Sequence, residues 1–429
     1  MSVLEEFRWR GMVHDVTEGA EEAFAGDSVT AYIGFDPTAR SLHVGTLLPI
    51  MGLVHLQRHG HRPIAVVGGG TGLIGDPSGK SQERVLLTRD EVAHNLEGIR
   101  VQLERFLDFD TEDNPARILN NLEWLGELSF VDFLRDVGKH FSVNVLLRKE
   151  SIRRRLEDEE TGISFTEFSY VLLQAYDFYE LYRRHGCTVQ LGGSDQWGNI
   201  VAGADLIRRV AGGKAHGVVF PLLTTSSGTK FGKTEEGTIW LDPERTSPFR
   251  FYQFWINTDD VDVVRHLKFF TLLDQEEIAD LQKAVEEEPW KRKAQRRLAE
   301  DVTRRVHGDE GLQRAERATR VLFGGEDLEG LGADEIADIF ADVPSTEITA
   351  GELDGEGKDL LDLLAEAGVT SSKGEARRSV DQGGIYLNNR RIEDQGRRVT
   401  LDDAVEERFL VLRKGKKRYH LVKVTGSDR

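Results

Sequence analysis

Two short apolar runs separated by a helix-length segment constrain the fold of this chain more than any other feature. Residues 29–35 and 63–67 are rich in β-branched and apolar side chains, and the stretch between them carries Leu, Met and His at helical spacing. A strand, helix, strand unit needs a crossover connection, which makes the two strands parallel. A third run, 187–191, follows a long helical segment and ends in Gly192-Gly193. The sequence therefore predicts an α/β fold with a parallel sheet.

The rest of the chain divides by pattern. Residues 247–322 are helical throughout, which predicts a separate helical domain. Residues 324–366 hold 14 acidic side chains and a single lysine, so we expect a poorly ordered linker with short helices. Residues 120–160 are charged and helical, and we interpret them as an insertion. After residue 371 a basic helix and short strands predict a small α+β unit.

Charge and composition narrow the class of protein. The chain has a net charge of −18, yet residues 370–429 carry 15 basic and 9 acidic side chains, so an anion would dock there. The acidic remainder fits a solvated surface or a high-salt habitat, and both stay open. The lone Cys187 excludes an internal disulfide framework. Without a long apolar run or a secretory signal, we expect a cytoplasmic protein with no membrane partner.

Two glycine-rich matches are misleading. Residues 70–75 read GTGLIG, which fits the dinucleotide fingerprint, but that motif needs its last glycine inside a helix. Here Pro77 follows too soon for a helix to continue. Residues 75–81 read GDPSGKS, with three residues between the glycines where a phosphate loop needs four. Neither standard nucleotide-binding interpretation holds, and the turn instead brings polar side chains to the sheet edge.

Two other segments are suited to a triphosphate. Residues 34–46 join a strand to a helix, where α/β proteins bind ligands, and include HVGT at 43–46. Helix N-termini there favour phosphate charge. Residues 228–234 read GTKFGKT, with Lys230 and Lys233 able to neutralise charge that builds up on a leaving pyrophosphate. Taken singly, these segments also fit a capped helix start and an exposed basic turn.

A polar stripe marks the helix predicted after residue 165. Tyr170, Gln174 and Asp177 fall at i, i+4 and i+7, so they share one face of an otherwise apolar helix. Burying them is costly unless a ligand or partner completes their hydrogen bonds. The alternative is a face open to water. His55, His59 and His61 have metal-like spacing, but we interpret them as exposed histidines at a helix end.

Together the two triphosphate segments resemble the paired signatures of class I aminoacyl-tRNA synthetases. Longer motifs are similar to those of the bacterial tyrosyl-tRNA synthetases in particular. They are GFDPT at 34–38, GLIGDPSG at 72–79, GGSDQWGNI at 192–200, KFGKT at 230–234 and FYQFWINT at 251–258. The resemblance implies a tyrosine–tRNA ligase that makes tyrosyl adenylate from L-tyrosine and ATP, releases pyrophosphate, and passes tyrosine to the terminal ribose of tRNA(Tyr).

The resemblance also implies the tyrosine pocket. The residues implied in tyrosine binding are Tyr32, Asp76, Tyr170, Gln174, Asp177 and Gln196. Of these, Tyr32 and Asp177 would bind the phenolic hydroxyl, and the others would hold or lie near the α-amino group. No separate editing domain is visible.

The ATP site follows in the same way. The residues implied at ATP and the adenylate are Gly34, Asp36, Thr38, Gly45, Gly193 and Asp195. The residues implied in catalysis are His43, Thr46, Lys80, Arg84, Lys230, Lys233 and Thr234. MgATP would be a co-substrate, and we expect neither a tightly bound cofactor nor a resident metal. Thr46 stands where the family has a second histidine, and threonine can donate one hydrogen bond but cannot be a cation.

The family also supplies a domain plan. It implies a Rossmann-like catalytic domain at 1–246 with a mobile loop at 228–236, an α-helical anticodon-side domain at 247–323, an acidic linker at 324–354 and a small RNA-binding domain at 355–429. That last domain resembles a fold named after a ribosomal protein, with Lys373, Arg377 and Arg378 along one helix for tRNA. Family members are homodimers, and we expect the 120–160 insertion to provide part of the contact.

Two rival functions remain to be weighed. Thr46 is compatible with an RNA-binding protein that keeps the synthetase fold without activity, although Asp76, Asp177, Asp195 and both loop lysines argue against this. A dinucleotide enzyme built on residues 70–75 is the other rival.

Overall fold

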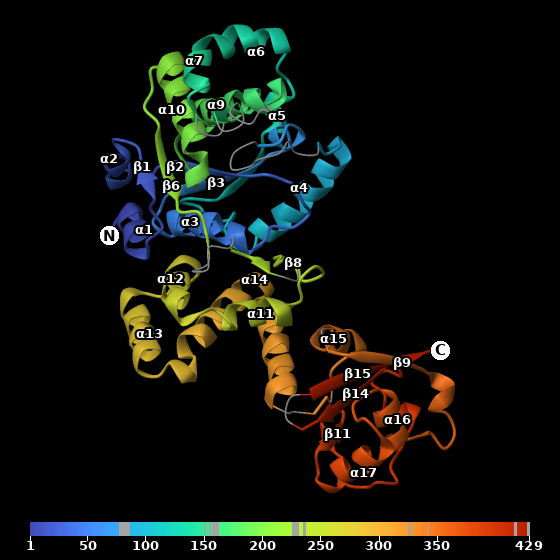
Figure 1. Cartoon of the computed structure of the whole chain (residues 1–429). Helices are drawn as coiled ribbons and strands as arrows, with labels where there is room; N and C mark the ends of the chain where they lie inside the picture. Colours follow the sequence, from blue (N-terminus) through green and yellow to red (C-terminus); the bar gives the residue numbers. More distant parts are fainter. Residues whose placement is uncertain are drawn as a thin grey trace. The chain divides into compact units, whose positions relative to one another are not determined.

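The chain folds into two compact units in the computed structural model (Figure 1). The structure describes residues 1–76, 86–149, 152–153, 156, 163–224, 231–234, 237–324, 327–328, 330–341, 343–415 and 418–426. The first unit comprises Met1–Thr246 and Phe254–Val306, and the second comprises Ser247–Gln253 and His307–Arg429. The helical region predicted at 247–323 thus contributes to both units.

A six-stranded sheet forms the centre of the first unit. Its strands are β1 (Asp15–Val16), β2 (Thr30–Phe35), β3 (Arg62–Val67), β4 (Arg117–Asn120), β5 (Cys187–Gly193) and β6 (His216–Phe220). They lie in the order β1-β6-β5-β2-β3-β4, and only the pair of β1 with β6 is antiparallel. The chain runs outward from β2 to β3 and β4 and returns on the other side as β5. The parallel sheet predicted from the sequence is confirmed, and its switch point lies between β2 and β5, where open α/β sheets bind ligands.

Helices accompany these strands (Figure 1). They are α1 (Val3–Arg10), α2 (Ala20–Ala25), α3 (Leu47–Arg58), α4 (Arg89–Leu103), α9 (Phe165–His185) and α10 (Trp197–Ala211). Helix α9 begins at a capping box formed by Ser164 and Glu167 and ends at Gly186, whose left-handed conformation suits glycine. It packs against α10 and against β5. The predicted helix between β2 and β3 is α3, whose side chains are largely buried.

Short helices form the described part of the predicted insertion. They are α5 (Leu122–Leu125), α6 (Phe130–Asp136) and α7 (Val143–Leu146). Several of their apolar side chains are exposed, among them Phe130 at 65% and Val131 at 71%. Such a surface is unusual for a region without a partner.

The chain then passes through a hairpin into a helical region. The hairpin pairs β7 (Lys233–Thr234) with β8 (Gly237–Thr238), and the helices are α11 (Pro248–Ile256), α12 (Asp260–Phe270), α13 (Gln275–Glu287) and α14 (Lys293–Thr319). Helix α14 is interrupted at Gly308, where φ is 75° and ψ is 179°. In the part of the chain that the structure describes, no helix is long and apolar enough to cross a membrane.

The second unit contains a five-stranded sheet in the order β12-β11-β14-β15-β9. Its strands are β9 (Ser345–Thr349), β11 (Ile385–Leu387), β12 (Arg390–Arg391), β14 (Phe409–Lys414) and β15 (Arg418–Thr425), and β10 (Lys358–Asp359) pairs separately with β13 (Arg398–Val399). Its helices are α15 (Ala333–Ile339), α16 (Leu360–Glu366) and α17 (Lys373–Asp381). A π-helical turn, Arg320–Gly324, follows α14.

Part of the segment predicted as an acidic linker is instead built into this unit. Helix α15 buries Ile336 and Ile339 against β14 and β15, and Phe340 is also buried there. Strand β9 pairs parallel to β15 along its whole length. The acidic composition of this segment predicts a linker because it does not show which side chains share a face. The few apolar side chains lie on one side and are buried, although acidic residues separate them in the sequence.

The histidines near the end of α3 also differ from expectation. His55 and His61 are buried rather than exposed, and their rings meet Phe7 and Phe24 edge-on. Burial lowers the pKa of His55 to about 2, so the ring stays neutral. Among the described residues, no group of three or more His, Cys, Asp or Glu side chains could hold a metal ion.

Candidate functional site

A cavity of about 960 Å³ opens at the carboxyl ends of β2, β5 and β6 in the first unit. All the predicted tyrosine- and adenylate-binding residues line it, together with two predicted catalytic residues. They are Tyr32, Gly34, Asp36, Thr38, His43, Gly45, Thr46, Asp76, Tyr170, Gln174, Asp177, Gly193, Asp195 and Gln196. The stripe on α9 therefore faces this cavity and not bulk water.

Tyr32 and Gln190 lie on the buried wall of the cavity. They are partners in the parallel register of β2 and β5, and each side chain is about 2% exposed. Neither the Tyr32 hydroxyl nor Gln190 Oε1 has a hydrogen-bond partner among the described residues. Buried polar atoms are rarely left without partners, so these two favour a polar ligand.

Asp177 is held by two side chains from the short-helix region, which runs from Asn121 to the end of α7. Trp124 donates its indole N–H to Asp177 Oδ1 over 2.7 Å, and Asn121 donates to Oδ2 over 2.9 Å. Asn121 in turn accepts the backbone N–H of Gly70 and donates to the hydroxyl of Thr71. The orientation of the carboxyl group is therefore fixed before any ligand arrives.

Burial dominates the electrostatics of this end of the cavity. It raises the pKa of Asp177 to about 7, with a further rise from the charge of Asp36, while the bonds from Asn121 and Trp124 oppose the shift. Burial, reinforced by the charge of Asp177, also raises the pKa of Tyr32. A phenol donor bound here would favour the ionised carboxylate.

A second polar cluster joins Gln174 on α9 and Asn199 on α10 to Gln196 and Asp76, which lie outside these two helices. Gln196 donates to Asp76 Oδ2 over 2.7 Å, and Asn199 donates to both Gln174 Oε1 and Gln196 Oε1 over 3.0 and 3.2 Å. Three hydrogen-bond acceptors therefore lie close together: the carboxylate of Asp76 and the side-chain carbonyl oxygens of Gln174 and Gln196. Such a set suits an ammonium group.

The first triphosphate segment forms a short 3₁₀ turn, Val44–Thr46, at the start of α3. His43 Nδ1 accepts the N–H of Gly45 over 3.0 Å, so Nε2 is the donor nitrogen of the neutral ring. A Cβ on Gly45 would lie 2.8 Å from the His43 ring, which explains the glycine. The Thr46 hydroxyl donates to the carbonyl of His43 over 2.6 Å, so it is already engaged within the turn.

The second triphosphate segment is described only in part. Phe231 lines the cavity, and Lys233 and Thr234 form β7, without a description of their side chains. Lys80, Arg84 and Lys230 lie outside the described residues. Their predicted roles therefore remain predictions.

The glycine-rich turn at 70–75 does not open an α-helix within its described length. Thr71–Leu73 form a 3₁₀ turn, and Gly75 is left-handed with φ of 85°. This geometry agrees with rejecting a dinucleotide fingerprint, which requires an α-helix at that point.

The predicted tRNA residues lie in the second unit, on α17. Arg377 and Arg378 are exposed, whereas Ala376 and Val380 turn inward. Lys373 is exposed and forms an ion pair with Asp362. The basic helix face predicted from the sequence is thus present on the surface of this unit.

Sequence reasoning missed Asn121, Trp124, Gln190 and Asn199. Asn121 and Trp124 are separated from Asp177 by more than fifty positions, so no local periodicity connects them. Asn199 gave a usable signal, because it lies in the motif quoted for residues 192–200, three positions after Gln196. Gln190 also gave a usable signal, because it is a long polar side chain in a buried strand, two positions before the glycines.

Comparison with known proteins places the chain in a family. A family model for class I tRNA synthetases (W and Y) matches residues 25–324, and one for a tyrosine–tRNA ligase SYY-like C-terminal domain matches residues 335–422. The tyrosine–tRNA ligase of Roseiflexus castenholzii is 55% identical over 423 residues, 99% of both chains. That of Bacillus caldotenax is 52% identical over 426 residues, 99% of this chain and 100% of its own.

Solved structures give the same picture for most of the chain. A C-terminally truncated mitochondrial tyrosyl-tRNA synthetase from Aspergillus nidulans superposes with a TM-score of 0.69 at 31% identity. The match covers 75% of this chain and 94% of the fungal one. A tyrosyl-tRNA synthetase from Archaeoglobus fulgidus, at 17% identity and a TM-score of 0.51, shares the fold.

Proposed function

Since this chain belongs to the tyrosine–tRNA ligase family of class I tRNA synthetases, we propose that the cavity of its first unit carries out both steps of that reaction. In the first step a carboxylate oxygen of tyrosine attacks the α-phosphate of MgATP, and pyrophosphate leaves. In the second step a terminal ribose hydroxyl of tRNA(Tyr) attacks the tyrosyl carbonyl carbon, and AMP leaves. Neither step needs a covalent enzyme intermediate, so positioning and charge stabilisation supply the rate.

The buried end of the cavity selects tyrosine in this proposal. The hydroxyl of the substrate donates to Asp177 and meets Tyr32, while Asp76, Gln174 and Tyr170 receive the α-amino group and Gln196 orients Asp76. The observation that carries the proposal is the fixed carboxyl of Asp177 beside the unpartnered hydroxyl of Tyr32. An amino acid without a phenolic hydroxyl would leave the buried Tyr32 hydroxyl without a partner and would give the buried Asp177 carboxyl no donor beyond Asn121 and Trp124, which is costly.

The open end of the cavity binds ATP. Gly34, Gly193 and Asp195 border the adenylate, and a Cβ on Gly34 would project into open space there. Asp36 and Thr38, which follow β2, bind ATP together with His43, Gly45 and Thr46 at the start of α3, where a helix N-terminus favours phosphate. The cationic groups that neutralise the departing pyrophosphate are Lys80, Arg84, Lys230 and Lys233, with the hydroxyl of Thr234.

Tyrosine-dependent exchange of labelled pyrophosphate into ATP tests the proposal directly. We expect exchange that requires tyrosine and is not supported by phenylalanine. A chain that binds tRNA(Tyr) but shows no exchange would instead be the inactive RNA-binding protein.

We assign tRNA binding to the second unit. Arg377 and Arg378 on α17 project from a region that is basic within an acidic chain, and phosphate contacts of this kind position a nucleic acid without reading its bases. Replacing both by Ala should weaken charging of tRNA(Tyr) at low tRNA concentration and leave pyrophosphate exchange unchanged.

The short-helix region is assigned to a homodimer contact. It leaves a set of apolar side chains exposed: Phe130, Val131, Leu134, Val143, Val145 and Leu147. A second copy of this surface would cover them.

With its single cysteine buried, the enzyme suits the reducing cytoplasm where tRNA is charged.

A further inference from the structure

Phe231, in the middle of the second triphosphate segment, sits in a cluster of aromatic rings from the helical region. Its ring is 5.3 and 5.7 Å from those of Phe254 and Trp255 on α11, and 4.9 and 5.6 Å from those of His266 and Phe270 on α12. The ring of Phe270 stacks on it with an interplanar angle of 10°. A buried aromatic side chain with this many ring contacts has little freedom to move.

The backbone next to Phe231 is fixed as well. The N–H of Phe231 donates to the carbonyl of Leu223 over 3.2 Å, and the carbonyl of Gly232 accepts the N–H of Ile239 over 3.0 Å. Gly232 is left-handed with φ of 80°, and a Cβ there would lie 2.4 Å from Val44 Cγ2. Glycine is therefore required at 232, because the backbone presses directly on the first triphosphate segment.

The chain after the hairpin ties the two segments together. The N–H of Val44 donates to the carbonyl of Ile239, and the N–H of Leu241 donates to that of Leu42, so 239–241 runs antiparallel beside 42–44. His43 and Trp240 face each other across this bridge, with ring centroids 6.1 Å apart. The middle of the second segment thus has a defined position relative to His43.

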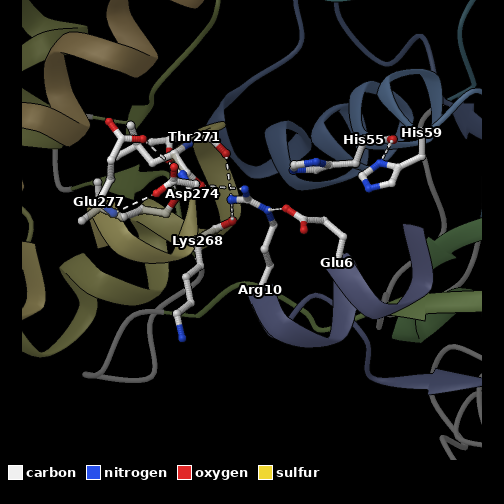
Figure 2. Close-up of polar contacts among 10 residues, drawn as sticks. Glu6, Arg10, His55, His59, Lys268, Thr271, Asp274 and Glu277 are labelled. Atoms are coloured by element: carbon white, nitrogen blue, oxygen red, sulfur yellow. Dashed lines mark hydrogen bonds and ion pairs between the residues drawn. The ribbon is translucent and has the colours of Figure 1, made fainter. Parts of the chain in front are cut away.

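The aromatic cluster is in turn fixed to the α/β core through α12. The buried guanidinium of Arg10 on α1 donates to the carbonyls of Lys268, Thr271 and Leu273 over 2.8 to 3.0 Å, and its Nε donates to Glu6. Figure 2 shows this guanidinium between Glu6 and the residues that end α12. Arg10 therefore satisfies carbonyls that the end of a helix leaves open, and it holds the helix that carries His266 and Phe270.

From these contacts we propose that Phe231 is a positioning residue for adenylate formation. Its ring fixes the backbone that leads into β7, in which Lys233 lies two residues further along the chain. The inference rests on the proposed role of Lys233 at pyrophosphate. Phe231 itself does no chemistry, and its contribution is to keep the backbone of β7 in register with the first triphosphate segment.

The test compares Phe231→Leu with Phe24→Leu, which shortens a phenylalanine of similar burial on α2, outside the cavity. Tyrosine affinity is measured by equilibrium dialysis and adenylate formation by rapid quench at saturating tyrosine and ATP. We expect Phe231→Leu to slow adenylate formation by about 10-fold or more with tyrosine affinity unchanged, because small misplacements of a catalytic group are costly. Phe24→Leu should change neither. A rate within about twofold of the parent, or a matching loss of tyrosine affinity, would overturn the proposal.

A double-variant cycle separates positioning from general damage. If Phe231 acts through Lys233, Phe231→Leu should have almost no further effect on the rate in a Lys233→Ala background. If the effects of Phe231→Leu and Lys233→Ala on the rate were fully additive, Phe231 would not act through Lys233. A parent protein without tyrosine-dependent exchange would refute the proposed function instead, so the two failures are distinguishable.

Discussion

The two ends of the cavity are built in different ways. The buried wall of the tyrosine end consists of side chains on regular elements, with Asp177 on α9 and Tyr32 on β2, and the Asp177 carboxyl is oriented by Asn121 and Trp124. The ATP end consists mainly of turns, in which Gly45 and Gly232 are required by close contacts. In the proposed function, the first arrangement fixes one small ligand in a buried pocket, and the second presents backbone to a large anion. Substrate choice and rate should therefore respond to different residues.

The largest expected effect lies at the ATP end. From the proposed role of Lys233 at pyrophosphate, Lys233→Ala should slow adenylate formation by about 10²- to 10³-fold, because the proposed charge stabilisation is needed only as pyrophosphate leaves. Tyrosine affinity, measured by equilibrium dialysis, should change little. Lys283→Ala, at a lysine on α13 that is 68% exposed, is the matched control. Equal losses of rate and affinity would contradict the separation of the two ends.

The next effect is a pH dependence at the tyrosine end. Because burial raises the pKa of Asp177 to about 7, the ligand-free carboxyl is neutral at lower pH, whereas a bound phenol favours the charged form. Tyrosine affinity should rise by up to about tenfold per pH unit toward pH 7 and then level off. By the same linkage, the stability gained from the neutral carboxyl is full below the ordinary pKa of 3.8 and is lost as the pH rises through about 7.

Equilibrium dialysis at pH values from about 5.5 to about 8 measures the tyrosine affinity of the parent and of Asp177→Asn. The variant should show a flat profile. A parent profile that is itself flat would mean that Asp177 does not accept the phenolic hydrogen bond.

A smaller effect is expected from Tyr32→Phe. The change removes one hydroxyl from the tyrosine pocket without leaving a charge unpaired, so tyrosine binding should weaken by about 0.5–1.5 kcal/mol. The variant should also discriminate less against phenylalanine, as measured by the ratio of kcat/KM values in pyrophosphate exchange. Unchanged discrimination would remove Tyr32 from the specificity pocket.

The smallest effect concerns Thr46. Its hydroxyl already donates to the carbonyl of His43, so Thr46→Ala should slow adenylate formation by only about two- to fivefold, the value of one modest hydrogen bond. A loss as large as that of Lys233→Ala would show that Thr46 grips the phosphates directly. Rapid-quench measurement of the single-turnover rate distinguishes the two outcomes.

Local periodicity was sufficient where the site depends on one element. The spacing of Tyr170, Gln174 and Asp177 predicts that they share one face of α9, and in the structure that face lines the cavity. The apolar runs predict the parallel pairing of β2 and β3. The roles of the ATP residues are implied only by the resemblance to the synthetase family, because short loop motifs are compatible with many structures. Asn121 and Trp124 could not be predicted, since their partner is distant in sequence. His55 and Ile336 were misjudged because composition says little about which face of a short segment is buried.

The independence of the two ends can be measured with the double variant Tyr32→Phe/Lys233→Ala. Rapid quench and equilibrium dialysis give the free energy of the transition state relative to free enzyme and tyrosine for the parent, both single variants and the double variant. If the tyrosine and ATP ends act separately, the two single effects should add to within about 0.5 kcal/mol. A coupling free energy above about 1 kcal/mol would contradict the account.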